Sequence, residues 1–311
     1  MKIVAFAGGV GGAKLADGLY QALAPEDLTI VVNTGDDFEH LGLTICPDLD
    51  TVCYTLAGLA NPETGWGRAG DTWKALEALA AVGGPDWFRL GDKDLGAHLE
   101  RSRRLAAGDP LSAITRDFCV AWDIGCVVLP MSDQPVRTIV ESDEGDLAFQ
   151  EYFVRRRFEP VVRGFRFQGA EAAPPAPGVL DAIAEAELVV FCPSNPWVSI
   201  APILAVPGMR EALTEKAVIA VSPIVGGAAL KGPAAKIYQE LGIEPSALAV
   251  AEHYRGLVQG CVIGNQDAAQ AGAIEALGIM PLVTDSIMRD KAGRLRLARE
   301  VLDFGQGLRK S

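Results

Sequence analysis

The chain contains 311 residues, of which 28 are Lys or Arg and 40 are Asp or Glu, giving a formal net charge of −12. Apolar residues make up 49% and charged residues 22%, a composition typical of globular proteins that excludes dominant disorder. The negative charge argues against a nucleic-acid-binding protein, and no apolar run reaches the roughly 18 residues that a membrane helix needs. The first residues enter an apolar run without a basic leader, so we expect a cytoplasmic protein with reduced, buried cysteines.

The chain opens with a strand, a glycine loop, a helix and a second strand. Apolar runs predict buried strands at residues 3–7 and 28–32, and leucines four residues apart predict a helix over residues 11–23. This order is typical of the start of a doubly wound parallel sheet. Helical periodicity follows at residues 72–81, 95–107 and 111–122.

The middle of the chain changes to an antiparallel pattern. After a strand at residues 126–129, we predict antiparallel strands at 136–141, 147–154 and 164–168 and a proline-rich surface linker at 172–178. The parallel pattern resumes with strands at 188–192, 217–221, 247–251, 261–263 and 281–283 and a last helix at 286–304. The fold class is therefore α/β, a doubly wound Rossmann-like and mostly parallel sheet with a small antiparallel excursion. Residues 1–134 and 179–311 are expected to form the ligand-binding core, and residues 135–178 the antiparallel insertion and linker.

A glycine-rich segment, GGVGGAK at residues 8–14, follows the first strand. Gly9, Gly11 and Gly12 let the backbone approach a phosphate, the next helix offers free N–H groups, and Lys14 adds a positive charge. The spacing matches neither the dinucleotide pattern G-x-G-x-x-G nor the P-loop pattern. The segment predicts a phosphate-binding loop of neither standard kind, the alternative being a tight turn that binds nothing.

Four acidic residues lie within fifteen positions: Asp36 and Asp37 after the second strand, then Asp48 and Asp50 beside Pro47. Carboxylate oxygens suit Mg²⁺, which usually keeps several waters and binds substrate phosphates. Four buried like charges are costly unless a cation or protons compensate them, which favours a metal site. The alternatives are capping of the next turns and, for Asp36, a hydrogen bond to a ribose.

Two further polar clusters follow later strands. Ser194 and Asn195 lie between two prolines, where Asn195 either reads a base edge or forms an ordinary Asn-Pro turn. A second glycine loop contains Ser222, Gly226 and Gly227 and is followed by Lys231, Gly232 and Lys236. Two glycine-and-lysine loops in an acidic protein favour a ligand with more than one phosphate.

The remaining motifs are weaker. Trp66 and Trp73 either stack on a flat ring or pack as ordinary aromatic side chains. Lys93 either contacts a ligand or lies in a solvated turn. The three histidines are isolated in sequence, and neither a G-x-S-x-G motif nor a C-x-x-C pair is present, so a hydrolase triad and a zinc site are not expected.

Taken together, these motifs resemble the 2-phospho-L-lactate transferase family of deazaflavin coenzyme F-420 biosynthesis. The resemblance covers most of the chain and rests on residues 8–14, 33–37, 46–58 (CPDLDTVCYTLAG), 65–67, 91–94, 129–133, 149–151, 193–196, 222–227 and 232–236. The chain departs from the family in its first loop, where the family often has Thr and Pro instead of Gly11-Gly12-Ala13.

The resemblance implies a Mg²⁺-dependent transferase and a homodimer. Such enzymes transfer a phosphorylated three-carbon acid from a guanosine diphosphate-linked donor to the ribityl hydroxyl of the deazaflavin riboside, and they release GMP. The transferred acid stays open between phospholactate, phosphoenolpyruvate and phosphoglycerate.

The resemblance also implies roles for single residues. Asp50, Asp36 and Lys93 would be catalytic, with Asp50 binding the metal or else orienting or deprotonating the acceptor hydroxyl. Contacts to the deazaflavin would come from Asp50, Lys93, Trp66 and Thr72, and metal ligands from Asp36, Asp37, Asp48 and Asp50. The donor would be bound by Gly9, Gly11, Gly12, Lys14, Ser194, Asn195, Ser222, Gly226, Gly227 and Lys236.

Two other functions remain as alternatives. One is a Rossmann oxidoreductase with Asp36 on the ribose of a nicotinamide cofactor; the missing third glycine counts against it. The other is a non-enzymatic regulator that binds a nucleotide or flavin; the acid cluster counts against it, because a binding protein needs no metal-centred carboxylates.

Overall fold

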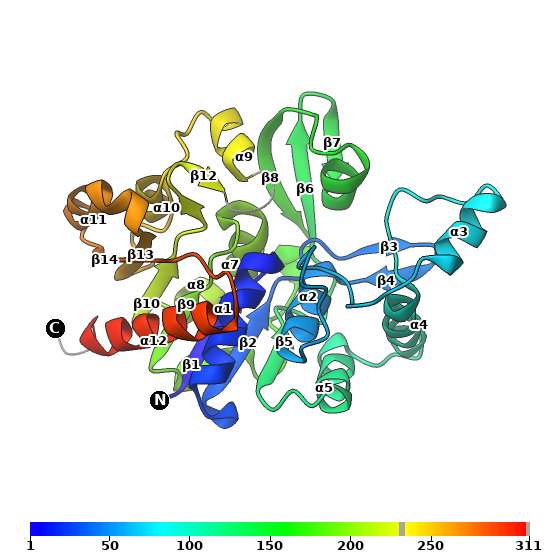
Figure 1. The fold of residues 1–311 in the computed structure, drawn as a ribbon, viewed down its shortest axis with the longest axis horizontal. Helices are drawn as coiled ribbons and strands as arrows, with labels where there is room; N and C mark the ends of the chain where they lie inside the picture. The colour runs from blue at the N-terminus through cyan, green and yellow to red at the C-terminus, as the bar shows by residue number, and fades with distance from the viewer. Residues whose placement is uncertain (230–233, 309–311) are drawn as a thin grey trace.

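The computed structural model describes residues 1–229 and 234–308. A seven-stranded sheet forms its centre, in the order β14-β13-β10-β9-β1-β2-β5 (Figure 1). Its strands are β1 (Ile3–Ala7), β2 (Leu28–Val32), β5 (Val127–Pro130), β9 (Leu188–Phe191), β10 (Val218–Val221), β13 (Gly260–Gly264) and β14 (Met280–Thr284). Every neighbouring pair is parallel, which confirms the doubly wound α/β fold.

Alternate residues of each central strand enter two separate cores because side chains point to opposite faces of a sheet. In β1, Ile3 and Ala5 belong to one core, and Val4 and Phe6 belong to the other. The first core is covered by α1 (Gly9–Ala22), α2 (Pro47–Leu56), α5 (Leu111–Ala121) and α12 (Lys291–Leu308). The second is covered by α6 (Val179–Glu185), α7 (Ala201–Ala205), α8 (Met209–Ala212), α10 (Ala247–His253) and α11 (Ala271–Ala276). Helices on both faces leave the carboxyl ends of the strands open for a site.

A separate antiparallel sheet has the order β7-β6-β8. Its strands are β6 (Arg137–Ser142), β7 (Gly145–Ala148) and β8 (Val162–Gln168). The predicted strand at 147–154 is wrong beyond Ala148, because residues Glu151–Arg155 form a π-helical turn, η2. The predicted surface linker is also wrong in part, since Ala173 and Ala176 are buried in the second core.

Two further sequence predictions need correction. Residues 247–251 form helix α10 rather than a strand; the Ser246 hydroxyl accepts the Ala249 N–H at 3.0 Å and starts the helix. The last helix begins at Lys291 rather than near residue 286, and the Asp290 carboxylate accepts the Gly293 N–H at 2.7 Å in its first turn. Residues 247–251 are apolar enough to fit a buried strand or a buried helix, so the local hydrogen bond decides between them.

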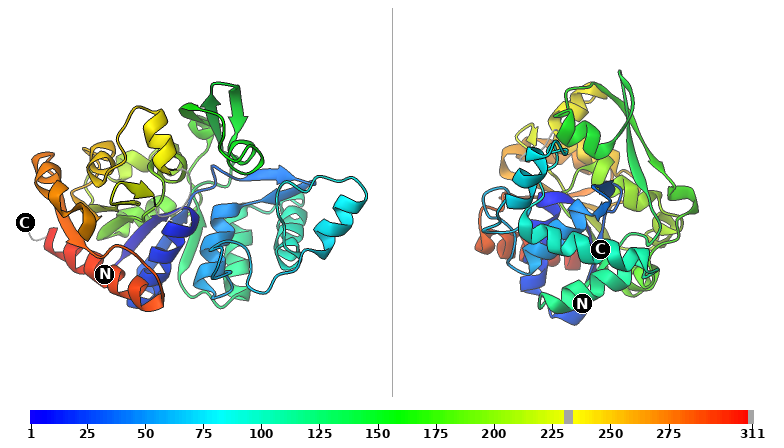
Figure 2. Two further views of the ribbon diagram at one scale, coloured as in Figure 1. Left: turned by 45° about the horizontal axis from the view of Figure 1, so that its top comes forward. Right: turned by 90° about the vertical axis from the view of Figure 1, so that its right-hand side faces the viewer.

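The segment between β2 and β5 extends beyond the sheet (Figures 1 and 2). It contains the hairpin β3 (Phe38–His40) and β4 (Leu43–Ile45) and helices α3 (Lys74–Ala81) and α4 (Asp92–Ala106). On the other side lie the short strands β11 (Ile224–Val225) and β12 (Ala228–Ala229) and helix α9 (Ala234–Glu240). Short helical turns complete the chain: η1 (Pro25–Asp27), η3 (Ala170–Ala172), η4 (Pro196–Ile200) and η5 (Asn265–Gln270).

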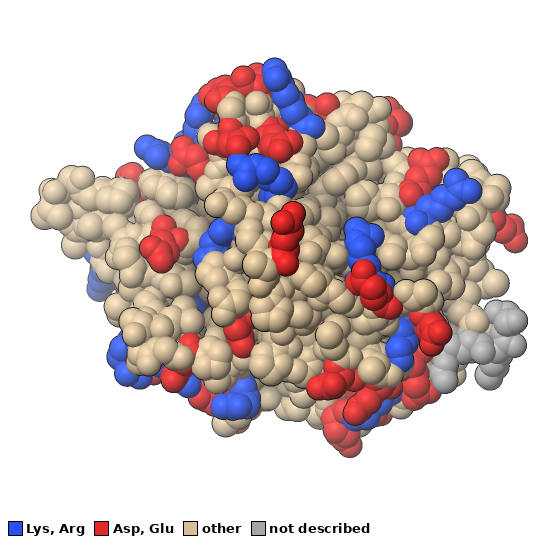
Figure 3. Space-filling view, turned by 180° about the vertical axis from the view of Figure 1, so that it is seen from behind, with Lys and Arg blue, Asp and Glu red and all other residues tan. Residues whose placement is uncertain are grey.

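The rear surface carries charged side chains of both signs, interspersed rather than separated (Figure 3). Within residues 1–229 and 234–308, no helix is both long and apolar enough to cross a membrane.

Candidate active site

A cavity of about 870 Å³ lies at the carboxyl ends of the central strands. Its walls come from the segments after β1, β9, β10 and β14, from α2 and α4, and from the antiparallel sheet region near η2. This is where ligands bind in doubly wound folds, and the volume suits two small molecules or one large one.

The first glycine loop forms one wall of the cavity, and its backbone packs directly against the segment that follows β9. The Gly9 N–H donates to Asp48 Oδ1 at 2.7 Å, and the Gly8 N–H donates to Ser194 Oγ at 3.1 Å. A Cβ on Gly11 would lie 2.3 Å from the Pro193 carbonyl oxygen. A side chain at position 11 would therefore clash with the neighbouring backbone, so close packing requires glycine at this position whether or not a ligand binds.

The other predicted residues of this wall divide into two groups. Lys14 lines the cavity and donates from Nζ to the Met288 carbonyl at 3.2 Å. Gly12 faces Ser194 instead, since its Cβ would lie 2.4 Å from Ser194 Oγ. Asn195 lines the cavity, but its Oδ1 already accepts the N–H groups of Trp197 and Val198 at the start of η4.

Asp36 and Asp48 share one hydrogen-bond donor at the cavity wall. The Asn33 amide donates to Asp48 Oδ2 at 2.9 Å and to Asp36 Oδ1 at 3.3 Å. Burial raises the pKa of Asp48 to about 6, and burial together with the charges of Asp48 and Asp37 raises the pKa of Asp36. Paired carboxylates with raised pKa values favour a bound cation or a shared proton.

Asp37 and Asp50 occupy different surroundings from that pair. Asp37 does not line the cavity; burial raises its pKa to about 7, and its Oδ1 has no hydrogen-bond partner among the described residues. Asp50 lines the cavity but is held by the Arg101 guanidinium, with Nη1 donating to Oδ2 at 3.0 Å and Nη2 pairing with Oδ1. The structure therefore separates the four acids that the sequence grouped together.

Arg101 and His98 were not identified from the sequence. Both project from α4 into the buried space beside Asp50, and His98 Nδ1 lies 3.6 Å from Asp50 Oδ2. Burial lowers the pKa of His98 to about 4, so the imidazole is neutral near pH 7. No local signal marked them, because the sequence of α4 is that of an ordinary surface helix with a basic end.

Aromatic residues line the part of the cavity that faces the extended segment. Trp66 lines it and is 42% exposed, and Trp87 and Phe88, whose rings pack edge to face, line it as well. Thr72 and Lys93 do not line the cavity. The Thr72 hydroxyl donates to Asp92, and Lys93 Nζ donates to the Ala69 carbonyl at 3.0 Å.

The second glycine loop contributes its first two residues, Ser222 and Pro223, to the cavity. Gly226, Gly227 and Lys236 do not line it. The Gly226 N–H donates to the buried Asp267 carboxylate, at 3.0 Å to Oδ2. Lys236 pairs with Glu240 and donates to the Pro160 carbonyl at 2.9 Å. The predicted Lys231 and Gly232 lie outside the described residues.

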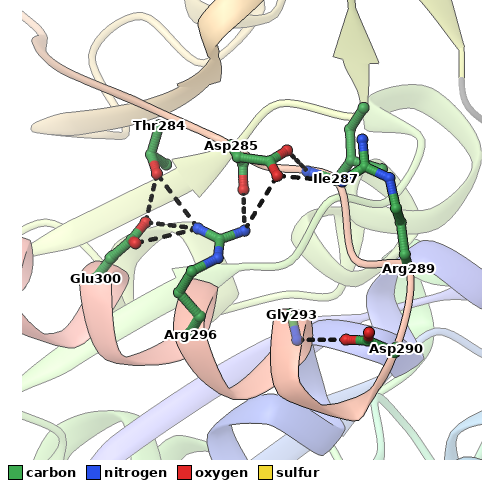
Figure 4. Close-up of polar contacts among 8 residues, drawn as sticks. All are labelled: Thr284, Asp285, Ile287, Arg289, Asp290, Gly293, Arg296 and Glu300. Atoms are coloured by element: carbon green, nitrogen blue, oxygen red, sulfur yellow. Dashed lines mark hydrogen bonds and ion pairs between the residues drawn. The ribbon is translucent and has the colours of Figure 1, made fainter.

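The loop between β14 and α12 forms another wall that the sequence prediction missed (Figure 4). Asp285 accepts the Ile287 N–H at 3.1 Å and Arg289 Nη1 at 3.1 Å. Arg296 holds this loop to the helix by donating to the Asp285 carbonyl and to Glu300. Arg289 is thereby fixed at the cavity rim.

The segment after β7 closes the cavity from the side of the antiparallel sheet. Phe149, Gln150, Phe153 and Phe158 line it there. Gln150 Nε2 donates to Asp36 Oδ2 at 3.4 Å and so links this segment to the acid pair.

Fold and site together define a doubly wound α/β enzyme with a ligand cavity at the strand carboxyl ends, lined by glycines, carboxylates and aromatic rings. The crystal structure of a Bacillus halodurans protein has this fold, with a TM-score of 0.64 and 17% identity over 97% of this chain and 99% of that one. The family model described as "2-phospho-L-lactate transferase CofD" matches residues 3–292. The chain therefore belongs to the 2-phospho-L-lactate transferase family and is a transferase.

Relatives in this family are similar along nearly the whole chain. A Streptomyces griseus protein is 47% identical over 99% of this chain and all of its own length, and a Streptomyces coelicolor protein is 45% identical over both full lengths. A Thermobifida fusca protein is 48% identical over 91% of this chain and 92% of its own length. Each of the three is named phosphoenolpyruvate transferase.

Proposed function

We propose that this protein transfers a phosphoenolpyruvyl group in coenzyme F-420 biosynthesis. The donor would be guanosine diphosphate-linked, the acceptor would be 7,8-didemethyl-8-hydroxy-5-deazariboflavin, and GMP would be released. The observation that carries the proposal is the family match over residues 3–292. The names of the relatives favour phosphoenolpyruvyl over 2-phospholactyl as the transferred group.

The cavity supports separate places for donor and acceptor. The donor diphosphate would lie along Gly9, Gly11 and Lys14, where the start of α1 and a lysine favour negative charge. Ser194, Asn195 and Ser222 line the neighbouring wall and would contact the rest of the donor. The acceptor ring would lie against Trp66, Trp87 and Phe88, which offer flat apolar faces.

Asp36 and Asp48 fit a magnesium ion better than the other acids do. They share the Asn33 amide, and both have pKa values raised by burial, so a cation would relieve their repulsion. Among the described residues, no group of three or more His, Cys, Asp or Glu side chains is arranged to hold a metal ion. An ion at Asp36 and Asp48 would therefore need water or substrate oxygens as its further ligands. Mg²⁺ accepts such a site, since it keeps waters, binds substrate phosphates and would neutralise the charge that develops on the diphosphate.

The residues of this chain would act mainly by positioning. The backbone of the first glycine loop and Lys14 would align the diphosphate, and Arg289 at the rim would lie close to the donor. The aromatic wall and the segment around Phe149 and Phe153 would exclude water from the transferred group. A homodimer and a cytoplasmic location remain predictions.

A transfer assay tests the function. Purified protein would be mixed with the deazaflavin, Mg²⁺ and each of the three guanosine diphosphate-linked donors, and product mass and GMP would be measured together. We expect a phosphoenolpyruvyl product from one donor only. Transfer from the phospholactyl donor alone would correct the acyl group, and no product from any donor would contradict the proposed reaction.

A further inference from the structure

Asp94 is a buried acid in the cavity wall that leaves one carboxylate oxygen without a hydrogen-bond partner among the described residues. It lies in the first turn of α4, is 7% exposed and lines the cavity. The oxygen concerned is Oδ1, which is buried. An unpartnered buried carboxylate oxygen is costly, so one that faces a cavity favours a ligand that donates a hydrogen bond.

The neighbouring acids are used by the protein itself. Asp71 accepts the N–H groups of Lys93 and Asp94, and Asp92 accepts the N–H of Ala75 at 3.0 Å and the Thr72 hydroxyl. These two acids hold the start of α4 against the preceding loop. Asp94 accepts none of these bonds; the polar groups that face its carboxylate are the Tyr54 hydroxyl and Arg68, and Oδ1 is left without a partner among the described residues.

Four carboxylates line the cavity, and the other three are engaged. Both oxygens of Asp50 are held by Arg101, and Asp36 and Asp48 share the amide of Asn33. Of these four, only Asp94 leaves a buried oxygen without a partner in the described part of the chain. Because both oxygens of Asp50 are already bonded to Arg101, Asp94 is the better placed of the two to accept a hydrogen bond from a ligand.

The surroundings of Asp94 suit a base near neutral pH. Asp50 and Tyr54 face it from α2, Arg68 and Asp71 face it from the loop before α3, and His98 lies one turn further along α4. Burial and the Asp50 charge raise the pKa of Asp94 to about 6, while the Tyr54 hydroxyl and Arg68 oppose the shift. A carboxylate of this kind is ionised at pH 7 and still able to accept a proton.

Asp94 also lies on the aromatic side of the cavity. A Cβ on Gly67 would be 3.5 Å from Asp94 Oδ2, which places the carboxylate under the loop that carries Trp66. The acceptor of the proposed reaction would occupy this side, so its hydroxyl groups would be within reach of Asp94.

We propose that Asp94 is the general base of the transfer, accepting a hydrogen bond from the attacking hydroxyl of the acceptor and then its proton. The hydroxyl oxygen forms a bond to the phosphorus that carries the three-carbon acid, and the bond from that phosphorus to the oxygen of GMP breaks. GMP leaves with the electron pair of the broken bond, and Asp94 holds the proton until solvent removes it. This inference rests on the proposed function.

The test compares wild type with Asp94→Asn in binding and in rate. We expect the variant to bind the deazaflavin with an affinity within about threefold of wild type, by quenching of its fluorescence, and to lose about 10²–10⁴-fold in kcat. With Mg²⁺ at saturating concentration, so that Asp36 and Asp48 stay ionised as its ligands, the kcat/KM of wild type should rise with pH up to about 6 and then level off, because the base must be ionised; the variant should lack this acidic limb. In Asp94→Ala, added formate should restore part of the rate.

Asp17→Asn is the matched control, since Asp17 is also buried but pairs with Arg294 away from the cavity. It should lower the melting temperature and leave the acidic limb in place. If wild type transfers but Asp94→Asn keeps its rate and its acidic limb, or loses only acceptor binding, Asp94 is not the base and the proposed function stands. If wild type transfers from no donor, the proposed function fails, and the role of Asp94 fails with it.

Discussion

The two glycine loops of this protein share a glycine-to-aspartate hydrogen bond but differ in whether that glycine lines the cavity. In each, a glycine N–H near the end of a central strand donates to a buried aspartate: Gly9 to Asp48 and Gly226 to Asp267. Asp48 belongs to the cavity wall, and so do Gly9 and Lys14 beside it. Asp267 lies outside the cavity, as do Gly226, Gly227 and Lys236.

The difference lies in position: Gly9 and Asp48 line the cavity, whereas Gly226 and Asp267 do not. At the second loop the carboxylate of Asp267 takes the place that a phosphate would take, and Lys236 is paired with Glu240. At the first loop the aspartate is itself part of the proposed ion site. The donor proposal therefore depends on the first loop and on Ser222, without the rest of the second loop.

Of the substitutions that compare the two loops, we expect Gly11→Ala to change the unfolding free energy most. The new Cβ would lie 2.3 Å from the Pro193 carbonyl oxygen, a backbone atom, so α1 or the loop after β9 must move. We expect a loss of about 3 kcal/mol in unfolding free energy, at the upper end for overpacking. Thermal unfolding followed by circular dichroism would measure it.

Gly226→Ala is the comparison for that change. Its Cβ would meet Gln266 at an ordinary 3.6 Å, so the cost comes only from the φ of +61°. We expect a loss of about 1–2 kcal/mol. Equal losses in the two variants would show that the first loop is no more tightly packed than the second.

The sequence was sufficient for most of the sheet and for the position of the first loop because their signals are local. Apolar runs at β1 and β2 and the glycines between them are contiguous, and the strand ends bring the loop to the correct edge. The strand predicted at 247–251 was wrong because its apolar residues suit a buried helix equally well, and only the Ser246 cap distinguishes the two.

The inner arrangement of the site was not predictable from local patterns. Asp36, Asp48 and Asp50 are close in sequence, but Asn33 binds the first two while Arg101, from a distant helix, holds the third. Asp267 lies 41 residues after the glycine whose N–H it accepts. Such pairings depend on how the chain packs.

The next effect concerns the two lysines that follow the loops. Lys14→Ala should weaken binding of the guanosine diphosphate-linked donor by about 10–100-fold, because a charge-assisted contact to phosphate is lost in a partly enclosed site. Lys236→Ala should change it less than about twofold, since Lys236 lies outside the cavity and pairs with Glu240. Calorimetric titration with the donor would measure both. A larger loss in the Lys236 variant would move the donor to the second loop.

The last effect is a pH dependence of stability that arises from Asp48 beside the first loop. Its pKa is raised to about 6 in the folded protein, so between pH 4 and 6 the native state binds more protons at this residue than the unfolded chain does. Without metal, the contribution of Asp48 to the unfolding free energy should therefore fall as pH rises through this range, by at most about 1.4 kcal/mol per pH unit. Asp48→Asn should flatten the curve, partly because it also removes a charge that raises the pKa of Asp36. Urea unfolding at several pH values, with a chelator present, would measure the slopes. Loss of the bond from Asn33 would change the unfolding free energy of the variant by the same amount at every pH and so would not change the slope. Parallel curves for the two proteins would therefore show that Asp48 is already ionised in the native protein at pH 5.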